Sequence, residues 1–427
     1  MDSDQSNLAP NPQTRPVSES SGFLFHNVTL LVLTGILLIS AWSGLATLVV
    51  LPGLVLGAAV LAKIWTRLSL VHVTCQRVIK VHRLFPGDPI ELAFQVVNRK
   101  PLPLPWLEVE DTIPLELADG EMPLSSRGPN FRSLIRSSSL LWYRRAKWKS
   151  QLRAQKRGYY PLGPIRLRSG DLFGFYARTI EFPASEPILV YPEILPLAQI
   201  SIPSLFPLGD VRSEKRIFQD PARPIGLRDY QPGDSLRHIH WKASSRSQRL
   251  QVKVFEPTTT LQASLFLAVD SFQENGEFHD QDFEWGISIA ASLAHHFMEK
   301  GIAAGLFVNT QQADSALPVR ILPGGSRKQI LILLEALAKI TPKPSEAFEL
   351  FLQRERRNLF LGNTLIFILK KISQNFSGQI EELREAGYKV RVFQIGDPEP
   401  SQLDPTILQR WARPSPSFPD PQRRRAS

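Results

Sequence analysis

The hydrophobic pattern at the start of the chain predicts membrane helices. No Asp, Glu, Lys or Arg occurs between Glu19 and Lys63. The uncharged apolar run from Val28 to Ala62 is roughly twice as long as one membrane helix needs, since about 20 residues cross the hydrocarbon core. Two spans are therefore expected, near residues 23–40 and 45–65. Together they predict a two-helix transmembrane hairpin over residues 23–65, behind a disordered leader of residues 1–22.

A cleaved signal peptide is the alternative interpretation of this run. Its apolar region is normally about 7 to 15 residues long and follows a positively charged segment. The leader here carries Arg15 against Asp2, Asp4 and Glu19. Basic residues follow the second span from Lys63 onward, and such flanks tend to stay in the cytoplasm. We therefore expect a multi-pass protein of the inner (plasma) membrane with its large C-terminal part in the cytoplasm.

Short apolar runs broken by Gly and Pro fill residues 70–200 and predict strands and turns. Ile90, Leu92, Phe94 and Val96 alternate with residues of another face, which is the period of a half-buried strand. The runs RGYYPLGPIRLRSGDLFGFY and EPILVYPEILPL continue the pattern, and no convincing helical period interrupts it. We expect an antiparallel β-sandwich-like domain here.

From residue 261 to residue 398 the pattern alternates strand with helix. LQASLFLAVD is a run of buried-strand type, and a helical period follows it. That period places five residues on one face: Phe283, Gly286, Ala290, Leu293 and Phe297. Continued alternation predicts an α/β domain with a doubly wound, mainly parallel sheet covered on both faces. Residues 399–427 lack an apolar period and are expected to form a flexible tail.

Composition narrows the classes of partner. The formal net charge of +10 favours an anionic neighbour, such as acidic lipid, nucleic acid or an acidic protein face. Cys75 is the only cysteine, which excludes an intramolecular disulfide and a Cys-rich zinc site. One cysteine also fits a reducing compartment.

A basic run with interleaved aromatic residues lies between Glu121 and Asp171, where no acid occurs. Its nine basic residues are Arg132, Arg136, Arg144, Arg145, Lys147, Lys149, Arg153, Lys156 and Arg157. One interpretation is a solvated strand pair with Trp142, Tyr143 and Trp148 on its packed face. Another is contact with the anionic inner leaflet, worth about 1 kcal/mol per basic residue near the surface. Nucleic-acid binding by charge and base stacking is the third, and it ranks below the membrane because no RNP, OB-type or zinc-finger signature is present.

The densest cluster of polar and aromatic residues is GLRDYQPGDSLRHIHWKASSRSQRLQVKVFEP, residues 226–257. Pro232 and Gly233 form a turn pair, and Asp234 stands where an N-cap would begin a short helix. LQVKVFEP is expected to be a strand. The candidate residues of this segment are Arg228, Tyr230, Gly233, Asp234, Arg237, Trp241, Lys242 and Arg246. Arginine forks can meet the carboxylates, so residues 201–260 could lock the two domains together or present a surface to a partner.

The spaced motif R-x-Y-x-x-G-D-x-x-R-x-I-x-W-K-x-S-x-R, from Arg228 to Arg246, resembles the signature of the bacterial family of domain of unknown function 58, DUF58. The resemblance extends over most of the chain, and the α/β domain of that family is similar to a von Willebrand factor A domain. His240 and Ser245 depart from the family pattern. The resemblance implies a membrane-anchored, non-enzymatic scaffold or adaptor. Its implied partners are a MoxR-type AAA+ ATPase and a client protein that is assembled or matured.

The same resemblance suggests that the chain could hold a metal ion, because von Willebrand factor A domains bind a divalent cation on a D-x-S-x-S motif after the first strand. Here the chain reads DSFQE from Asp270, so only Asp270 is in register. Hard cations need several convergent oxygen ligands. Asp270 is therefore a weak metal candidate, and no cofactor is expected.

Enzyme interpretations find little support in the motifs. His238 and His240 have the wrong spacing for the H-E-x-x-H zinc face. Lys242 and the serines after it lack a glycine motif for an oxyanion hole. We expect no enzyme and no small-molecule substrate. A hydrolase that uses the signature is the remaining alternative, and it predicts that Asp234→Asn abolishes turnover while the fold is kept.

Overall fold

The computed structural model divides the chain into two compact units, Met1–Glu193 and Ile194–Ser427. It describes residues 15–21, 27–43, 46–117, 124–126, 131–183, 187–196, 219–231, 239–257, 262–274, 276–359, 363–396, 403–404 and 407–411.

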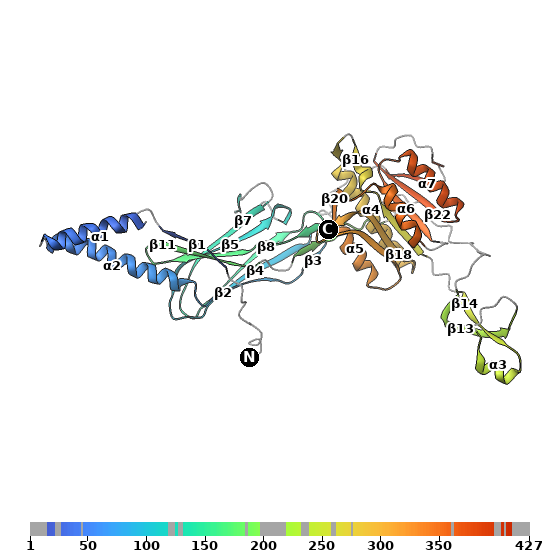
Figure 1. The fold of residues 1–427 in the computed structure, drawn as a ribbon, viewed down its shortest axis with the longest axis horizontal. Helices are drawn as coiled ribbons and strands as arrows, with labels where there is room; N and C mark the ends of the chain where they lie inside the picture. Colours follow the sequence, from blue (N-terminus) through green and yellow to red (C-terminus); the bar gives the residue numbers. More distant parts are fainter. Residues whose placement is uncertain are drawn as a thin grey trace, which may run out of the picture. The chain divides into compact units, whose positions relative to one another are not determined.

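Two apolar helices open the first unit, α1 (Asn27–Trp42) and α2 (Ala46–Ser69). They lie side by side, with Leu37 of α1 against Gly53 of α2 (Figure 1). Within the described residues, only the segment Val49–Ser69 is long and apolar enough to cross a membrane, and the apolar part of α1 is shorter. The structure therefore has two helices whose ends differ from the expected 23–40 and 45–65. Among the described residues, one of them, α2, is a candidate membrane span. A hairpin that crosses twice stays a prediction.

The β-strands of the first unit form one large sheet and two small ones. The large sheet has the order β1-β11-β10-β5-β7-β6. Its strands are β1 (Arg15–Ser21), β11 (Tyr176–Phe182), β10 (Ile165–Gly170), β5 (Leu104–Pro114), β7 (Phe131–Leu140) and β6 (Leu124–Ser126). The second sheet is β2 (Val73–Ile79), β4 (Pro89–Asn98) and β8 (Arg145–Arg153). The third is β3 (Arg83–Leu84), β12 (Ile188–Val190) and β9 (Gly158–Tyr160).

One hydrophobic core joins these sheets. The predicted alternation in β4 is confirmed, because Ile90, Leu92, Phe94 and Val96 are buried while the residues between them are more exposed. These four side chains belong to one buried cluster with residues of β5, β7 and β10, as in two sheets packed face to face. A 3-10 turn at Leu115–Leu117 is the only helical element described after α2 in this unit.

Two expectations for the first unit need correction. Residues Arg15–Ser21 form β1 and pair antiparallel with β11, so the disordered leader is wrong for this stretch. The backbone of an edge strand gains its order from hydrogen bonds to a distant strand, which a local pattern does not contain. In addition, β12 pairs parallel with β3, so the unit is not purely antiparallel.

The second unit contains a seven-stranded, mainly parallel sheet in the order β19-β18-β15-β21-β22-β23, with β20 beside β18. Its strands are β15 (Gln262–Leu267), β18 (Ala303–Gln312), β19 (Ser315–Gly324), β20 (Ile340–Pro344), β21 (Thr364–Leu369), β22 (Lys389–Ile395) and β23 (Leu408–Trp411). Only β19 and β20 pair antiparallel within it. Numbered along the chain, β15, β18, β19, β21, β22 and β23 give the doubly wound order 3-2-1-4-5-6. The strand β23 shows that the expected flexible tail is wrong for Leu408–Trp411.

Helices cover both faces of this sheet (Figure 1). They are α4 (Asp280–Glu299), α5 (Gln329–Lys339), α6 (Phe348–Glu355) and α7 (Gln374–Glu385). Adjacent residues of a strand point to opposite faces. Phe367 of β21 packs against Phe348 and Phe376 of α6 and α7, whereas Ile368 lies against Gly286 of α4. The predicted apolar face of α4 is confirmed, since its five residues are buried.

Candidate functional site

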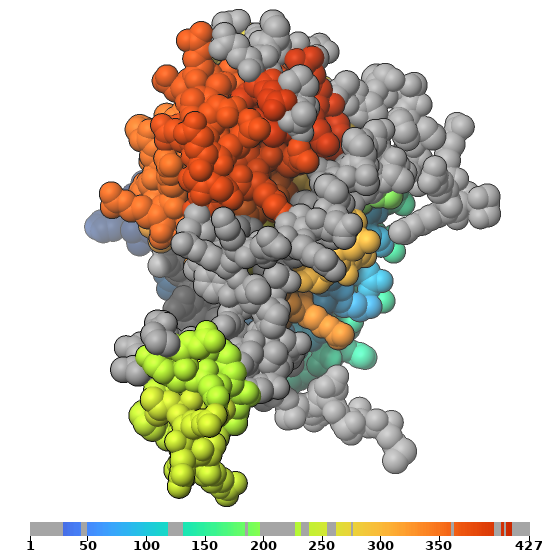
Figure 2. Space-filling view, turned by 90° about the vertical axis from the view of Figure 1, so that its right-hand side faces the viewer, coloured from blue at the N-terminus to red at the C-terminus, as the bar shows by residue number. Residues whose placement is uncertain are grey.

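The signature segment folds as a two-stranded ribbon that carries a short helix. β13 (Gln219–Asp229) pairs antiparallel with β14 (Gln251–Pro257), and α3 (Trp241–Ser247) lies between them in sequence. Ile239 bridges to Val252, and both side chains are buried. Figure 2 shows the atoms of this ribbon as one yellow-green lobe. The strand predicted for LQVKVFEP is confirmed from Gln251 onward, and Leu250 before it is exposed.

His240 caps the helix of the ribbon. Its Nδ1 accepts a hydrogen bond of 3.1 Å from the backbone N–H of Ala243, and the backbone N–H of His240 donates to the carbonyl of Gln251 at 2.8 Å. An N-cap side chain satisfies one of the free N–H groups in the first helical turn. An imidazole nitrogen thus takes the place usually given to Ser, Thr, Asn or Asp. The expected cap, Asp234, lies outside the described residues, as do Gly233 and Arg237.

Ser244 fastens the helix to the strand after it. Its hydroxyl donates to the carbonyl of His240 at 3.1 Å and accepts from the backbone N–H of Gln251 at 2.8 Å. The side chain is 9% exposed. Both hydrogen-bonding roles of this hydroxyl are therefore used within the ribbon, whereas the neighbouring Lys242 is exposed.

The charge network of the ribbon differs from the expected one. The Asp229 carboxylate accepts a hydrogen bond from Gln251 and lies 3.9 Å from the Arg249 guanidinium. Arg228 donates to the backbone carbonyl of Asp229 at 3.1 Å. Arg249 and Gln251 were not among the predicted residues, and their pairing follows from the β13–β14 register, in which Asp229 faces Gln251. Of the other predicted residues, Tyr230 is half-buried, while Trp241, Lys242 and Arg246 are exposed.

A second candidate lies at the carboxyl end of β15, beside the point where the strand order reverses. Doubly wound sheets generally bind ligands at such a switch point. Asp270 opens a 3-10 turn there. A hollow of about 190 Å³ adjoins it, with six polar residues in its lining: Asp270, Ser271, Gln273, Glu349, Lys371 and Ser373.

Asp270 has protein partners on both carboxylate oxygens. Oδ1 accepts from Nδ2 of Asn309 at 2.9 Å, and Oδ2 accepts from the backbone N–H of Phe348 at 2.8 Å. Phe348 is the first residue of α6, so the carboxylate caps this helix from a distant strand and meets the positive end of its dipole. Burial raises the pKa of Asp270 above its usual value, and the Phe348 and Asn309 hydrogen bonds oppose that rise. Ser271 is engaged too, since its hydroxyl donates to the Ala268 carbonyl at 2.6 Å and accepts from the Lys370 N–H at 3.0 Å.

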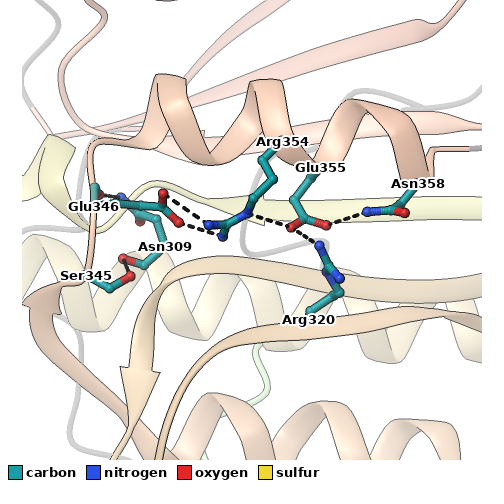
Figure 3. A network of polar contacts seen from close by, with 7 residues as sticks. All are labelled: Asn309, Arg320, Ser345, Glu346, Arg354, Glu355 and Asn358. Atoms are coloured by element: carbon teal, nitrogen blue, oxygen red, sulfur yellow. Dashed lines mark hydrogen bonds and ion pairs between the residues drawn. The ribbon is translucent and has the colours of Figure 1, made fainter.

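Polar contacts hold α6 where Asp270 can cap it (Figure 3). Fully buried Asn309 donates to the Glu346 carbonyl at 2.9 Å and accepts from the backbone N–H of Val269 at 2.8 Å. At the other end of α6, the buried Glu355 carboxylate is paired with Arg320 of β19. Arg354 joins Glu346 to Glu355 at 2.6 and 3.6 Å.

These contacts weaken the metal interpretation of Asp270. Among the described residues, no group of three or more His, Cys, Asp or Glu side chains could hold a metal ion. The oxygens of Asp270 and Ser271 already bind protein groups. The arrangement builds a helix cap, which short-range sequence spacing could not reveal because Phe348 lies 78 residues after Asp270.

The basic run does not form a single strand pair, which was the first of its three interpretations. Arg132 and Arg136 belong to β7 of the large sheet, whereas Arg145 begins β8 of another sheet. Exposed basic side chains on β8 are Arg145, Lys147, Lys149 and Arg153. Arg144, Lys156 and Arg157 lie in the segments that flank β8.

The aromatic residues of the run also differ from expectation. Trp148 is partly buried and packs against the core, as expected. Trp142 and Tyr143 are 56% and 67% exposed instead, because they lie in the turn that carries the chain from one sheet to the other.

Comparison with known proteins supports the resemblance to DUF58. Residues 226–404 match the family model described as "Protein of unknown function DUF58", a stretch that runs from the ribbon through β22 of the α/β sheet. A curated relative is "Uncharacterized protein YeaD" of Bacillus subtilis (strain 168), which is 27% identical over 226 residues. The alignment covers 52% of this chain and 52% of the relative, so it spans about half the length of each.

Solved structures add no functional argument. A part of alpha-2-macroglobulin from Escherichia coli matches with a TM-score of 0.21 and 17% identity, covering 28% of this chain and 24% of that chain. The DNA-bound alkylpurine DNA glycosylase AlkC of Pseudomonas fluorescens matches with a TM-score of 0.18 and 13% identity, covering 38% and 42%. Scores this low carry no conclusion about this protein.

Proposed function

We propose that this protein is a membrane-anchored, non-enzymatic scaffold or adaptor whose signature ribbon docks a partner. The observation that carries the proposal is the exposure of Trp241, whose side chain is 68% accessible at the start of α3. Exposed Lys242 and Arg246 lie on the same short helix. Tryptophan and arginine are the residues that most often dominate protein interfaces. Of the ribbon groups that the structure describes, His240 and Ser244 have catalytic potential, and both have structural partners.

The resemblance to DUF58 gives the partner in this proposal, a MoxR-type AAA+ ATPase together with a client protein. In this scheme the ATPase supplies nucleotide hydrolysis, and the present chain supplies anchorage and docking. The ribbon then acts as a partner surface rather than as an interdomain lock.

The α/β unit fits a von Willebrand factor A-like scaffold in the same proposal. Its support is the 3-2-1-4-5-6 strand order with β19 antiparallel at one edge. Asp270 occupies the switch point, and its use as a helix cap favours a scaffold over a metal-dependent adhesion site.

The anchor in the proposal is α2, with α1 as a second span and the large C-terminal part in the cytoplasm. Support comes from the apolar segment Val49–Ser69 and from Lys63 and Arg67 near its C-terminal end. A multi-pass arrangement in the inner membrane follows if both helices cross.

The test is affinity purification of the full chain from detergent-solubilised native membranes. Wild type is compared with the double variant Trp241→Ala, Arg246→Ala, and with Leu317→Ala, which removes a 73% exposed apolar side chain from β19. An AAA+ ATPase should be recovered with wild type and Leu317→Ala and lost with the double variant. Hydrogen exchange over residues 239–257 checks that the ribbon is still folded. Equal recovery from all three proteins would remove the ribbon from the docking surface, and no ATPase in any of them would sink the proposal.

Nucleic-acid binding is the second candidate, favoured by the exposed basic side chains of β8. It predicts an affinity for single-stranded DNA that falls steeply with salt. Replacing Lys147 and Lys149 with Gln should weaken that affinity, while Trp241→Ala should leave it unchanged. Hydrolysis by the signature stays a third candidate, and its Asp234 lies outside the described residues.

A further inference from the structure

Two turns of the first unit expose large apolar side chains. Turn A, residues 141–144, connects β7 to β8, and its Leu141, Trp142 and Tyr143 are 54%, 56% and 67% exposed. Turn B, residues 171–175, connects β10 to β11, and its Leu172 and Phe173 are 68% and 67% exposed. Exposed apolar clusters of this kind mark contact sites.

Turn B is held in one conformation by a buried carboxylate. Asp171 is 1% exposed, and its oxygens accept from the backbone N–H groups of Phe173, Phe175 and Tyr176 at 2.8, 3.2 and 2.6 Å. Gly174 takes a φ of +74°, which completes the tight turn. The turn therefore presents Leu172 and Phe173 outward on a fixed backbone.

Turn B lies at the end of the large sheet that adjoins the helix pair. Strand β1 ends at Ser21 opposite Tyr176, the residue that follows turn B, and α1 begins at Asn27. Thr66 of α2 donates to the Tyr176 carbonyl at 3.3 Å. Two residues further along β11, Arg178 donates to the Arg67 carbonyl at 2.8 Å. The segment that leads into α1 and the C-terminal end of α2 therefore both lie at the turn B end of the large sheet.

Turn A lies at the corresponding end of the second sheet. Tyr143 donates its backbone N–H to the Lys100 carbonyl at 3.3 Å. The Lys100 ammonium in turn donates to carbonyls at the C-terminus of α2, at 2.6 Å to Leu68 and 2.9 Å to Val71. Val73 begins β2 beside this point and pairs with Asn98, whose N–H donates to the carbonyl of Arg144. Turn A is thus tied to the end of the candidate membrane span.

We propose that turns A and B seat in the headgroup region of the anionic leaflet at which α2 leaves the membrane. This inference rests on the proposed role of α2 as an anchor. Tryptophan and tyrosine favour the membrane–water interface, which suits Trp142 and Tyr143. Exposed Arg144 and Arg145 follow at once and can meet lipid phosphates.

A lipid surface is the occupant that the position of the turns favours. Turn A is linked to the C-terminal end of α2 through Lys100, and Tyr176, the residue after turn B, accepts from the Thr66 hydroxyl of α2. A bilayer that holds α2 would therefore approach both turns. The apolar side chains of the turns could reach the acyl-chain boundary of a bilayer, while the basic side chains beside them meet the phosphates above it. The β domain would then have a fixed seat on the membrane in addition to its helical tether.

Single-site labelling of the full chain tests the proposal, because the chain has one cysteine and that cysteine is buried. In a Cys75→Ala background, nitroxide labels are placed by Phe173→Cys, Trp142→Cys, Leu54→Cys and Leu317→Cys. The proteins are reconstituted in nanodiscs made of equal parts of phosphatidylcholine and phosphatidylglycerol. Collision of each label with oxygen, which enriches in lipid, is compared with collision with a water-soluble nickel complex.

The labels at positions 54 and 317 are references for hydrocarbon and for water, and their oxygen-to-nickel collision ratios set the limits of the expected result. Leu54 is 68% exposed on α2 and should report hydrocarbon, whereas Leu317 is 73% exposed on β19 and should report water. Labels at 173 and 142 should give oxygen-to-nickel ratios between these two, with 173 on the lipid side. Thermal unfolding of each labelled protein checks its fold.

Two results would overturn the proposal in distinguishable ways. If the label at 54 reports lipid while those at 142 and 173 match Leu317, the anchor stands and the turns face water, free for a protein partner. If the label at 54 also reports water, the membrane anchor of the proposed function fails and the seating of the turns fails with it.

Discussion

The guanidinium of Arg77 on β2 and the carboxylate of Asp111 on β5 form an ion pair inside the first unit, with side chains 1% and 0% exposed. Arg77 also donates to the carbonyl of Gly163 at 2.7 Å. The pair therefore links the second sheet to the large sheet. Separating either charge from its partner would leave the other buried without compensation.

Removing one member of this pair should destabilise the first unit strongly. Arg77→Ala or Asp111→Ala is expected to lower the free energy of unfolding by about 3–5 kcal/mol. The combined variant Arg77→Met, Asp111→Leu should lie much closer to wild type, because neither member of the pair is left as an unpaired buried charge. Thermal unfolding of the detergent-solubilised proteins measures this. Equal losses in the single and combined variants would show that shape, rather than charge, determines the cost.

The same carboxylate predicts a pH dependence. Burial raises the pKa of Asp111 from 3.8 to about 6, although the nearby Arg77 charge opposes the rise. The folded protein thus holds this proton more tightly than the unfolded chain. The stabilising contribution is complete below pH 3.8 and is lost as the pH rises through about 6.

An Asp111→Asn variant isolates this effect from other acids. As the pH rises from about 4 to 7, the melting temperature of wild type should fall relative to that of Asp111→Asn. A difference that stays constant over this window would contradict the raised pKa.

The third prediction concerns Lys100, which stabilises the junction between α2 and the β domain. Its ammonium binds carbonyls at the C-terminus of α2, and burial lowers the pKa of this group to about 8. Lys100→Met leaves those carbonyls without their donor and should cost about 1–3 kcal/mol. Exposed Lys156→Met is the matched control. Proteolysis within residues 68–73 should accelerate only in the Lys100 variant, and equal rates in both would reject the role of Lys100 at the junction.

Local periodicity predicted the parts of the fold in which burial alternates within one element. The faces of β4 and α4 follow from the spacing of Phe94 or Phe297 with their neighbours. The edge strands β1 and β23 escaped prediction because they depend on backbone pairing with a strand far away in sequence. The strand-pair interpretation of the basic run failed for a related reason: a basic aromatic run has the same sequence pattern whether its residues pair in one sheet or cross between two.

The candidate site shows the same limit. The motif located the ribbon, and the exposed Trp241, Lys242 and Arg246 belong to the predicted set. The partners of its polar groups depend on register and on helix position, so the cap by His240 and the pairing of Asp229 with Arg249 were not foreseen.

The His240 cap gives a fourth prediction. His240→Ala removes the acceptor for the Ala243 N–H and should destabilise α3 by about 1 kcal/mol. His240→Asp restores an N-cap acceptor and should keep the helix. Hydrogen exchange over residues 241–247 is the measurement, with faster exchange expected for the alanine variant alone. Faster exchange in both variants would mean that the imidazole has a further role in the ribbon.

Asp270 allows the helix-cap and metal interpretations to be separated by one pair of measurements. Asp270→Ala leaves the Phe348 N–H and the buried Asn309 amide without their acceptor and should cost about 1–3 kcal/mol, whereas exposed Glu385→Ala on α7 should cost little. Added Mg²⁺ or Mn²⁺ should leave the melting temperature of wild type unchanged, because both Asp270 oxygens already accept hydrogen bonds. A cation site would behave differently, since a ligand that binds only the folded state raises the melting temperature as its concentration rises. A cation-dependent rise in the melting temperature of wild type that disappears in Asp270→Ala would therefore support a metal centre over the helix cap. The remaining ligands would then be expected in the hollow lined by Glu349 and Ser373.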